Sequence, residues 1–279
     1  MIVILVALIV ASITDIKTRE VPDWLSYAFV AGAAGIRIIE SLITNSIQPF
    51  LFGLAGFGLC FLIGYALYRT AQWGGGDTKL LMGVGAAIGL PWPLNEVPTL
   101  SLFLVNMMVT GAMMGIIALV FYGIQYREKT VQEFKKHVDS HKAIGKAIIV
   151  GLVSLLAVYI LYDPQKVMLI VLPLIVIPPA YYTMLLVKSV EKTVFMRVIP
   201  PHELTEGDWL AEPVKVGNAI VVHAAHGGVT KKDIKKLIEL GEQGKVKKVV
   251  MKAGIPFVPS FLAGYICTIV IGNWFALLL

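Results

Sequence analysis

The chain has 279 residues, of which 57% are hydrophobic and only 15% are charged, and its mean hydropathy is +0.78. About a quarter of the residues in a typical soluble domain are charged, so the composition excludes an ordinary soluble globular protein and predicts an integral membrane protein. The formal net charge of +6 is then explained by lysine and arginine on the cytoplasmic side of a membrane. We find no nucleic-acid-binding motif and expect no nucleic-acid partner.

The N-terminal segment, residues 1–13, is apolar but has no basic residues ahead of it and no convincing cleavage site before Asp15. A secretory signal peptide normally has both, so we expect a retained first helix. A spanning helix needs about 20 residues. The helix could therefore continue through Asp15 before Lys17 and Arg19 mark the membrane surface.

Seven further apolar segments predict an all-α polytopic membrane protein with about eight transmembrane helices. Pro22 suits the first turn of the second helix, and Trp24 suits the membrane interface. Arg37 lies inside the second span, where its charged end is expected to reach the surface. The expected spans after the first cover residues 24–43, 50–68, 78–90, 100–124, 147–162, 167–187 and 257–279.

Two polar stretches interrupt the apolar pattern, so we divide the chain into membrane helices at 1–187, a module at 188–254 and a last transmembrane helix at 255–279. The basic loop at 125–146 is expected to form an amphipathic helix on the membrane surface. The module is expected to be a small cytoplasmic α+β unit, inserted before the last helix. Its predicted elements are strands at 219–222 and 246–251 and a helix at 231–240, which Thr230 caps and Gly241 and Gly244 end.

The basic residues predict the orientation of the chain. If Met1 lies outside and eight spans alternate, the loops that hold nearly all of the 24 lysine and arginine residues fall inside. Only Lys166 lies in an outside loop, and Arg37 lies within a span. Both termini are then outside the cell membrane, and Asp15 and Asp77 both lie at the cytoplasmic face.

Other residue types give little sign of a metal or cofactor site. Cys60 and Cys267 both lie in apolar runs and form neither a zinc spacing nor a disulfide framework. His223 and His226 have no further ligands near them in the sequence, so we expect them to be solvated or turn residues. We therefore expect no metal and no cofactor.

The segment 73–79, Trp-Gly-Gly-Gly-Asp-Thr-Lys, places a carboxylate at the edge of an apolar segment. When two carboxyl groups share a site, repulsion raises the pKa of one, so that one is protonated and the other ionised near neutrality. Asp15 and Asp77 could thus hydrolyse a peptide bond through an activated water molecule. Two structural explanations stay open: Asp77 as a helix N-terminal acid, and Asp15 as the partner of Lys17 or Arg19.

Three motifs resemble those of the type IV prepilin peptidases, and in particular of the archaeal preflagellin (prearchaellin) and prepilin peptidases, which are GxGD aspartic membrane proteases. Asp15, followed by Val21-Pro22-Asp23-Trp24, is similar to the first-aspartate motif. Residues 74–79, Gly-Gly-Gly-Asp-Thr-Lys, match the Gly-x-Gly-Asp-x-Lys motif. Residues 256–261, Pro-Phe-Val-Pro-Ser-Phe, resemble the later Pro-Phe-x-Pro motif. The match is weaker across residues 125–252.

The resemblance implies a peptidase that cleaves class III signal peptides from prearchaellins or prepilins on the cytoplasmic side of the lipid bilayer. It implies that Asp15 and Asp77 are the catalytic pair. Bacterial relatives that N-methylate the product commonly carry a four-cysteine region, which is not found here, so we expect no methylation. The supporting motif residues are Pro22, Gly74, Gly76, Lys79, Pro256 and Pro259, and Glu20 and Asp23 could attract a basic leader or be ordinary surface acids.

Two other functions remain open on the sequence. A presenilin-like intramembrane protease also uses a Gly-x-Gly-Asp motif, but its first aspartate follows a tyrosine deep in a span, whereas Asp15 follows Thr14 near an interface. An ion-coupled transporter could use both acids as coupling groups. Transporters hold such groups at mid-membrane and commonly show internal repeats, and this sequence shows no clear repeat.

Overall fold

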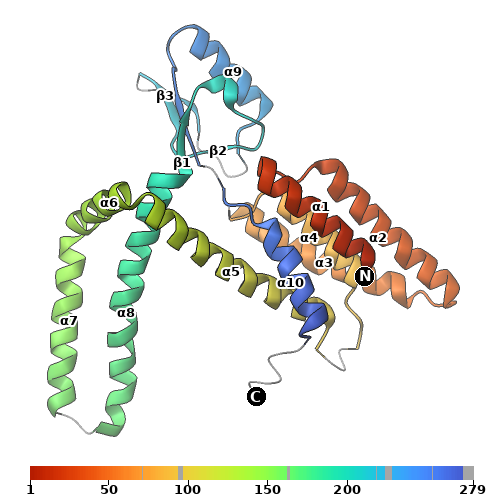
Figure 1. Ribbon diagram of the computed structural model, residues 1–279, viewed down its shortest axis with the longest axis horizontal. Helices are drawn as coiled ribbons and strands as arrows, with labels where there is room; N and C mark the ends of the chain where they lie inside the picture. The colour runs from red at the N-terminus through yellow and green to blue at the C-terminus, as the bar shows by residue number, and fades with distance from the viewer. Residues whose placement is uncertain are drawn as a thin grey trace. The chain divides into compact units, whose positions relative to one another are not determined.

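The computed structural model describes residues 1–70, 72–93, 97–161, 164–217, 219–223, 228–252 and 254–272. The chain divides into two compact units. Unit 1 comprises residues 1–116 and 198–279, and unit 2 comprises residues 117–197. Figure 1 shows the helices and the small strand-containing region, coloured along the chain. Each unit is described separately below.

The membrane part of unit 1 is helical. Its described residues form six helices, of which five are α1 (Ile2–Thr18), α2 (Asp23–Ile43), α3 (Gln48–Arg69), α4 (Gly75–Ile88) and α10 (Val258–Val270). The sixth, α5 (Thr99–Gln125), starts in unit 1 and ends in unit 2. Within the described residues, three helices are long and apolar enough to cross a membrane, namely α2, α3 and α5. A membrane protein with several apolar helices is thus supported, while the count of eight spans stays a prediction; residues 273–279 of the expected last span lie outside the described residues.

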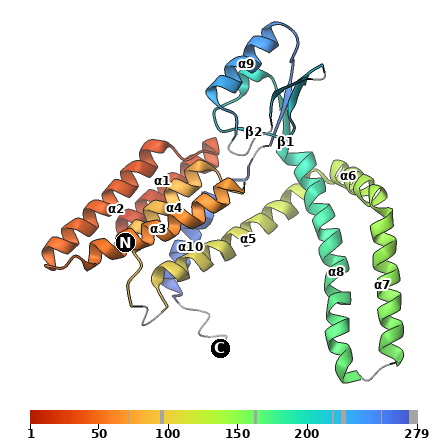
Figure 2. The same cartoon turned by 180° about the vertical axis from the view of Figure 1, so that it is seen from behind.

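The short helix α4 packs against both α2 and α3, and α10 packs against α1 (Figures 1 and 2). Glycine allows the close approach of α3 and α4, because a Cβ on Gly56 or Gly85 would collide with the backbone of the facing helix. Thr78 fastens the start of α4 by donating its hydroxyl hydrogen to the Gly64 carbonyl of α3 or the Gly74 carbonyl, each 3.2 Å away. Residues around the circumference of α4 are buried, so α4 is the central helix of this bundle.

Arg37 has a structural role that the sequence did not indicate. Its side chain is only 17% exposed. Its guanidinium group donates to the Ala87 and Ile88 carbonyls at 2.7 and 2.5 Å, and it pairs with Glu40 at 2.8 Å. The last carbonyls of a helix lack partners within the helix, and a cation there also interacts favourably with the helix dipole. Arg37 therefore caps the C-terminus of α4 from α2.

Replacing Arg37 by methionine is expected to destabilise the protein by about 2 kcal/mol, because hydrogen bonds to a charged group contribute about 1.5–3 kcal/mol. Methionine keeps an apolar side chain of similar length, so the loss of stability measures the hydrogen bonds from the guanidinium group to the end of α4. The matched control is Glu40→Gln, which removes the half-exposed partner and is expected to change stability by less than about 1 kcal/mol. The thermal unfolding midpoint in detergent measures both; equal midpoints for the two variants would show that the cap contributes nothing.

The polar part of unit 1 follows the predicted α+β pattern. Strand β4 (Ala219–Val222) forms as expected and pairs antiparallel with β3 (Val214–Val216). A second sheet has the order β1 (Met196–Ile199), β5 (Val249–Lys252), β2 (Trp209–Leu210). Helix α9 (Lys231–Glu242) is capped by Thr230, whose hydroxyl accepts from the Asp233 backbone N–H at 3.3 Å. It continues through Gly241 and stops before Gly244, which has a φ of +71°.

Two predicted boundaries in the later half of the chain are shifted. The second strand of the module begins at Val249 instead of residue 246. In unit 2, α6 (Arg127–Ser140) is followed closely by α7 (Lys142–Leu161), so the helix expected from residue 147 begins five residues earlier. Helix α8 (Pro164–Val190) continues through Pro178 and Pro179 and ends at a π-helical turn, η1 (Glu191–Phe195). Glu133 on α6 pairs with Lys136 and Lys192, which joins α6 to this turn.

Candidate active site

Asp15 lies on the buried face of α1. The buried residues Leu8, Ala11, Ser12 and Asp15 follow the helical repeat, which turns the acid toward the interior, and Asp15 is only 6% exposed. Its Oδ2 atom accepts the backbone N–H of Val258 at 2.9 Å. The carboxyl group therefore has a fixed position, although it stands near the C-terminal end of its own helix, where the dipole disfavours an acid.

The partner of Asp15 is the start of α10, which carries the third motif. Val258 is the first residue of α10, and Pro259 follows in the first turn, where a missing N–H is tolerated. Asp15 thus stabilises the N-terminus of another helix by satisfying one of its unpaired donors. Arg19 holds the segment just before α10 by donating to the Gly254 carbonyl at 2.9 Å. The first and third motifs are therefore in direct contact.

Asp77 stands in the first turn of α4. Its Oδ2 accepts the backbone N–H of Gly74, which is the N-cap residue, at 3.2 Å. This contact is what an acid at a helix N-terminus makes for structural reasons alone. The charge of Asp15 also acts on the Asp77 carboxyl group. Asp15 and Asp77 are 62 residues apart in the sequence, on helices α1 and α4.

Gly76 brings the second motif against the first. A Cβ placed on Gly76 would stand 3.1 Å from Cβ of Val21 and 3.4 Å from its carbonyl oxygen. Val21 is buried and precedes Pro22, whose carbonyl accepts the first backbone hydrogen bonds of α2. The absence of a side chain at Gly76 therefore lets the start of α4 lie against the segment that joins α1 to α2.

Gly76→Ala and Gly75→Ala are expected to have opposite effects on stability. Alanine is better than glycine in a helix by up to about 1 kcal/mol, and a Cβ on Gly75 would meet nothing within 4 Å. Gly75→Ala should therefore leave the unfolding temperature unchanged or raise it slightly. Gly76→Ala should lower it, because Val21 must move by a few tenths of an ångström. The two unfolding curves, measured side by side, test the contact; an equal gain in both variants would refute it.

Lys79 contacts Asp23 instead of Asp77. Its Nζ atom lies 2.5 Å from the Asp23 carboxylate and 5.2 Å from the centre of the Tyr27 ring. This pair joins α4 to the first turns of α2. Glu20 is exposed and accepts a hydrogen bond from the Thr205 hydroxyl at 3.4 Å. Of the two acids proposed to attract a leader, Asp23 is thus already paired with a cation.

Trp73 contributes to the site in a way that the sequence did not reveal. Its ring lies 5.4 Å from the rings of both Phe257 and Phe261, measured between centroids. Phe257 also fills the space over Gly111 of α5. Trp73 precedes the glycine-rich segment, so this aromatic cluster connects the Asp77 turn to the start of α10, whose first backbone N–H binds Asp15. The sequence contains only a weak sign of this contact, namely that the segment 73–79 and the motif at 256–261 both contain aromatic residues.

The described ranges contain no group of three or more His, Cys, Asp or Glu residues that could hold a metal ion. His226 lies outside those ranges, and Cys60 and Cys267 are free thiols. What the site does offer is two carboxyl groups at helix ends, held by backbone N–H donors. Each of these carboxyl groups can accept or donate a proton.

Comparison with known proteins finds relatives for the first part of the chain. Residues 2–129 match the type IV leader peptidase family. The preflagellin peptidase of Methanococcus voltae is 36% identical over 84 residues, which cover 30% of this chain and 36% of that protein. The preflagellin peptidase of Methanococcus maripaludis is 35% identical over 104 residues, or 33% of this chain and 44% of that protein. No solved structure matches.

These two matches cover less than half of each relative's length. A third preflagellin peptidase, from Methanocaldococcus jannaschii, is 34% identical over 83 residues, covering 30% of this chain and 35% of that protein. The family match includes both Asp15 and Asp77 and agrees with the resemblance of their motifs. Residues 2–129 are therefore similar to the type IV leader peptidase family, and parts of the chain are similar to preflagellin peptidases.

Proposed function

We propose that the protein is a membrane-embedded aspartic endopeptidase that removes class III signal peptides from prearchaellins or prepilins. The observation that carries this proposal is that the charge of Asp15, from the first motif, acts on the Asp77 carboxyl group of the second motif, with both acids inside the family-matched region. The names of the relatives, all preflagellin peptidases, support the substrate class. Asp15, Asp77 and the scissile bond are the only reacting groups that the proposal needs, besides water.

In the proposed reaction the two carboxyl groups share a proton. The ionised group takes a proton from a water molecule, whose oxygen attacks the scissile carbonyl carbon, while the protonated group donates a hydrogen bond to the carbonyl oxygen. Breaking the C–N bond then releases the amine, which takes up a proton. Neither a metal ion nor a covalent intermediate takes part, and no cofactor is required.

The surroundings of Asp77 suit an extended peptide. Gly74 and Gly75 have no close neighbours at their Cβ positions other than Asp77 itself, so a substrate backbone can approach this turn closely. The leader of a class III precursor is basic, and we propose that Glu20 attracts it. Asp23 could attract the leader only if it gave up its ion pair with Lys79. Pro22, Pro256 and Pro259 are proposed to hold the two segments beside Asp15 in shape.

We further propose that the site faces the cytoplasm, with both termini outside, because that orientation puts nearly all basic loops inside. The product is proposed to keep an unmethylated N-terminus. The given sequence has two cysteines, Cys60 in α3 and Cys267 in α10. It therefore contains no four-cysteine site of the kind that accompanies methylation in bacterial relatives.

The test is cleavage of a co-expressed prearchaellin, followed by mass spectrometry of the product. We expect one cut just before the hydrophobic segment and an unmodified new N-terminus. A cut inside the hydrophobic segment would instead indicate an intramembrane protease. Intact precursor, in membranes that hold the folded enzyme, would contradict the proposed function, and ion flux coupled to the two acids would favour a transporter.

A further inference from the structure

The two acids of the candidate site are held in the same way, each by a backbone N–H at the start of a helix. Asp15 accepts the Val258 N–H at 2.9 Å. Asp77 accepts the Gly74 N–H at 3.2 Å. The relative position of these two donors therefore helps to set the relative position of the two carboxyl groups, and whatever holds the donors together also holds the acids together.

An aromatic residue directly precedes each donor, and the two rings are in contact. Trp73 comes immediately before Gly74, as Phe257 does before Val258. Their ring centroids lie 5.4 Å apart, with an angle of 48° between the planes, and a separation of about 4.5–7 Å is typical of favourable aromatic pairs. Because the peptide bond is planar and joins Cα atoms about 3.8 Å apart, this contact is one peptide unit away from each N–H that holds an acid.

Helix α5 fixes the α10 side of this contact. Phe261, one turn after Phe257, is fully buried, and its ring lies 5.4 Å from the Trp73 ring and 5.8 Å from the Phe257 ring. The Phe103 ring of α5 meets Phe261 edge to face at 6.4 Å. The Phe257 ring in turn fills the space over Gly111 of α5. Trp73 therefore packs against a pair of rings that α5 holds in place.

The Asp77 side of the contact depends on Trp73, because the residues between them have no side chains. Residues 74–76 are all glycine, and glycine loses more conformational freedom on folding than any other residue. The backbone N–H of Trp73 donates to the Leu67 carbonyl near the end of α3 at 3.2 Å. Trp73 is thus held by α3 through its backbone and by α10 through its ring, and it is the nearest side chain ahead of Asp77 that can hold the glycine turn.

We propose that Trp73 is a positioning residue, which keeps Asp77 in register with Asp15 by fixing the Gly74 amide against the start of α10. This role rests on the proposed function, in which the two acids act together. Without the ring, both carboxyl groups and both donors remain, but the glycine turn samples more positions and the acids are correctly placed less often. The loss should therefore appear in kcat, and KM should change little, because no group that binds the leader is removed.

The test compares Trp73→Ala with Trp73→Phe in the cleavage of a purified precursor by the reconstituted full-length protein, at a temperature where every variant is folded. Trp73→Ala should lower kcat about a hundredfold, since a misplacement of about 1 Å can cost that much in rate. Trp73→Phe keeps a ring against Phe257 and should recover most of kcat. A ring with a merely structural role would lower the unfolding temperature and leave kcat unchanged, and that result would overturn the proposal.

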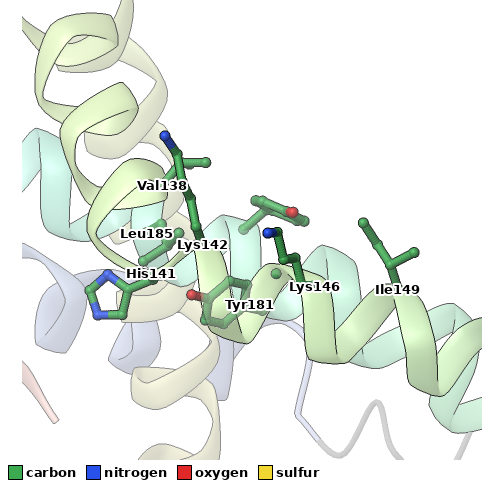
Figure 3. A pocket seen from close by; sticks show the side chains of 9 residues that line it. Val138, His141, Lys142, Lys146, Ile149, Tyr181 and Leu185 are labelled. Atoms are coloured by element: carbon green, nitrogen blue, oxygen red, sulfur yellow. The ribbon is translucent and has the colours of Figure 1, made fainter.

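The matched control is Tyr181→Ala, which removes a half-buried ring from unit 2. The Tyr181 ring contacts the Tyr182 ring at a centroid distance of 5.5 Å, close to that of the Trp73 pair. Tyr181 lines a cavity of about 190 Å³ between α6, α7 and α8 (Figure 3) and belongs to none of the three motifs. The control should lower the unfolding temperature without lowering kcat. An equal loss of kcat in Trp73→Ala and Tyr181→Ala would overturn the proposal.

Hydrogen exchange tests the positioning without any cleavage. In Trp73→Ala the Gly74 amide should exchange about tenfold faster, which corresponds to about 1.4 kcal/mol of local stability, and in Trp73→Phe it should exchange at the unmodified rate. If the unmodified protein does not cleave the precursor, the proposed function fails, while the exchange rates still decide whether Trp73 fixes this amide. Equal exchange rates in the unmodified protein and in Trp73→Ala would overturn the proposal whatever the peptidase result.

Discussion

Replacing either Asp15 or Asp77 by asparagine is expected to lower kcat/KM for precursor cleavage by at least about a thousandfold. A carboxyl group that transfers protons in the rate-limiting step contributes about 10²–10⁴ in rate, and groups acting as one unit contribute more. Asparagine has nearly the same shape but cannot exchange a proton near neutral pH. Timed cleavage of a purified precursor by each reconstituted variant measures the loss.

The same substitution separates a chemical role from a structural one. Asp15 accepts a hydrogen bond from Val258, and Asp77 accepts one from Gly74, and the carbonyl oxygen of asparagine can accept both. If the two acids only stabilised helix N-termini, the asparagine variants would keep most of their activity. Glu40→Gln, which neutralises an acid that pairs with Arg37, is the control and should cleave normally. A rate near the unmodified rate in either aspartate variant would contradict the catalytic assignment.

Gly85→Val is expected to have the largest effect on stability, about 3 kcal/mol or more. A Cβ at Gly85 would collide with the Gly56 carbonyl oxygen and stand 2.6 Å from the Cys60 sulfur. Overpacking of a tight contact usually costs 1–3 kcal/mol, and more where backbone must move. A loss of this size lowers the unfolding temperature by roughly 10 °C, and α4 would shift and carry Asp77 with it.

The control for this variant is Gly58→Val on α3. Gly58 has nothing within 4 Å of its Cβ position, so valine there adds apolar surface without a collision. The unfolding temperature, followed by size-exclusion chromatography after heating, should fall for Gly85→Val and stay within about 2 °C for Gly58→Val. Similar temperatures for the two variants would show that α3 and α4 are not in close contact at Gly56.

The sequence predicted the local features of the site well. Acids at the end of α1 and the start of α4, and a helix that begins near Val258, all follow from apolar periodicity, proline and charge. The Thr230 cap of α9 was likewise predicted, because capping depends on residues three positions apart. Resemblance to family motifs then grouped Asp15, Asp77 and residues 256–261 before any contact between them was known.

The sequence could not predict which residues meet across helices. Arg37 was expected to reach the membrane surface, yet it caps α4, 50 residues further along the chain. Lys79 was a motif residue without a role until its contact with Asp23 was seen. These contacts depend on the rotation and separation of packed helices, which the close contacts of Gly56, Gly76 and Gly85 set. Neither the composition nor the periodicity of the sequence determines how packed helices are rotated or how far apart they lie.

The most direct test of the account is the double variant Asp15→Asn/Asp77→Asn, compared with both single variants under single-turnover conditions. Groups that act as one unit are strongly non-additive, so that removing the second costs little once the first is gone. We predict that all three variants cleave the precursor at the same residual rate while unfolding at the temperature of the unmodified protein. A double variant slower than either single variant by the product of their separate losses would show that Asp15 and Asp77 act independently, and would contradict a shared catalytic site.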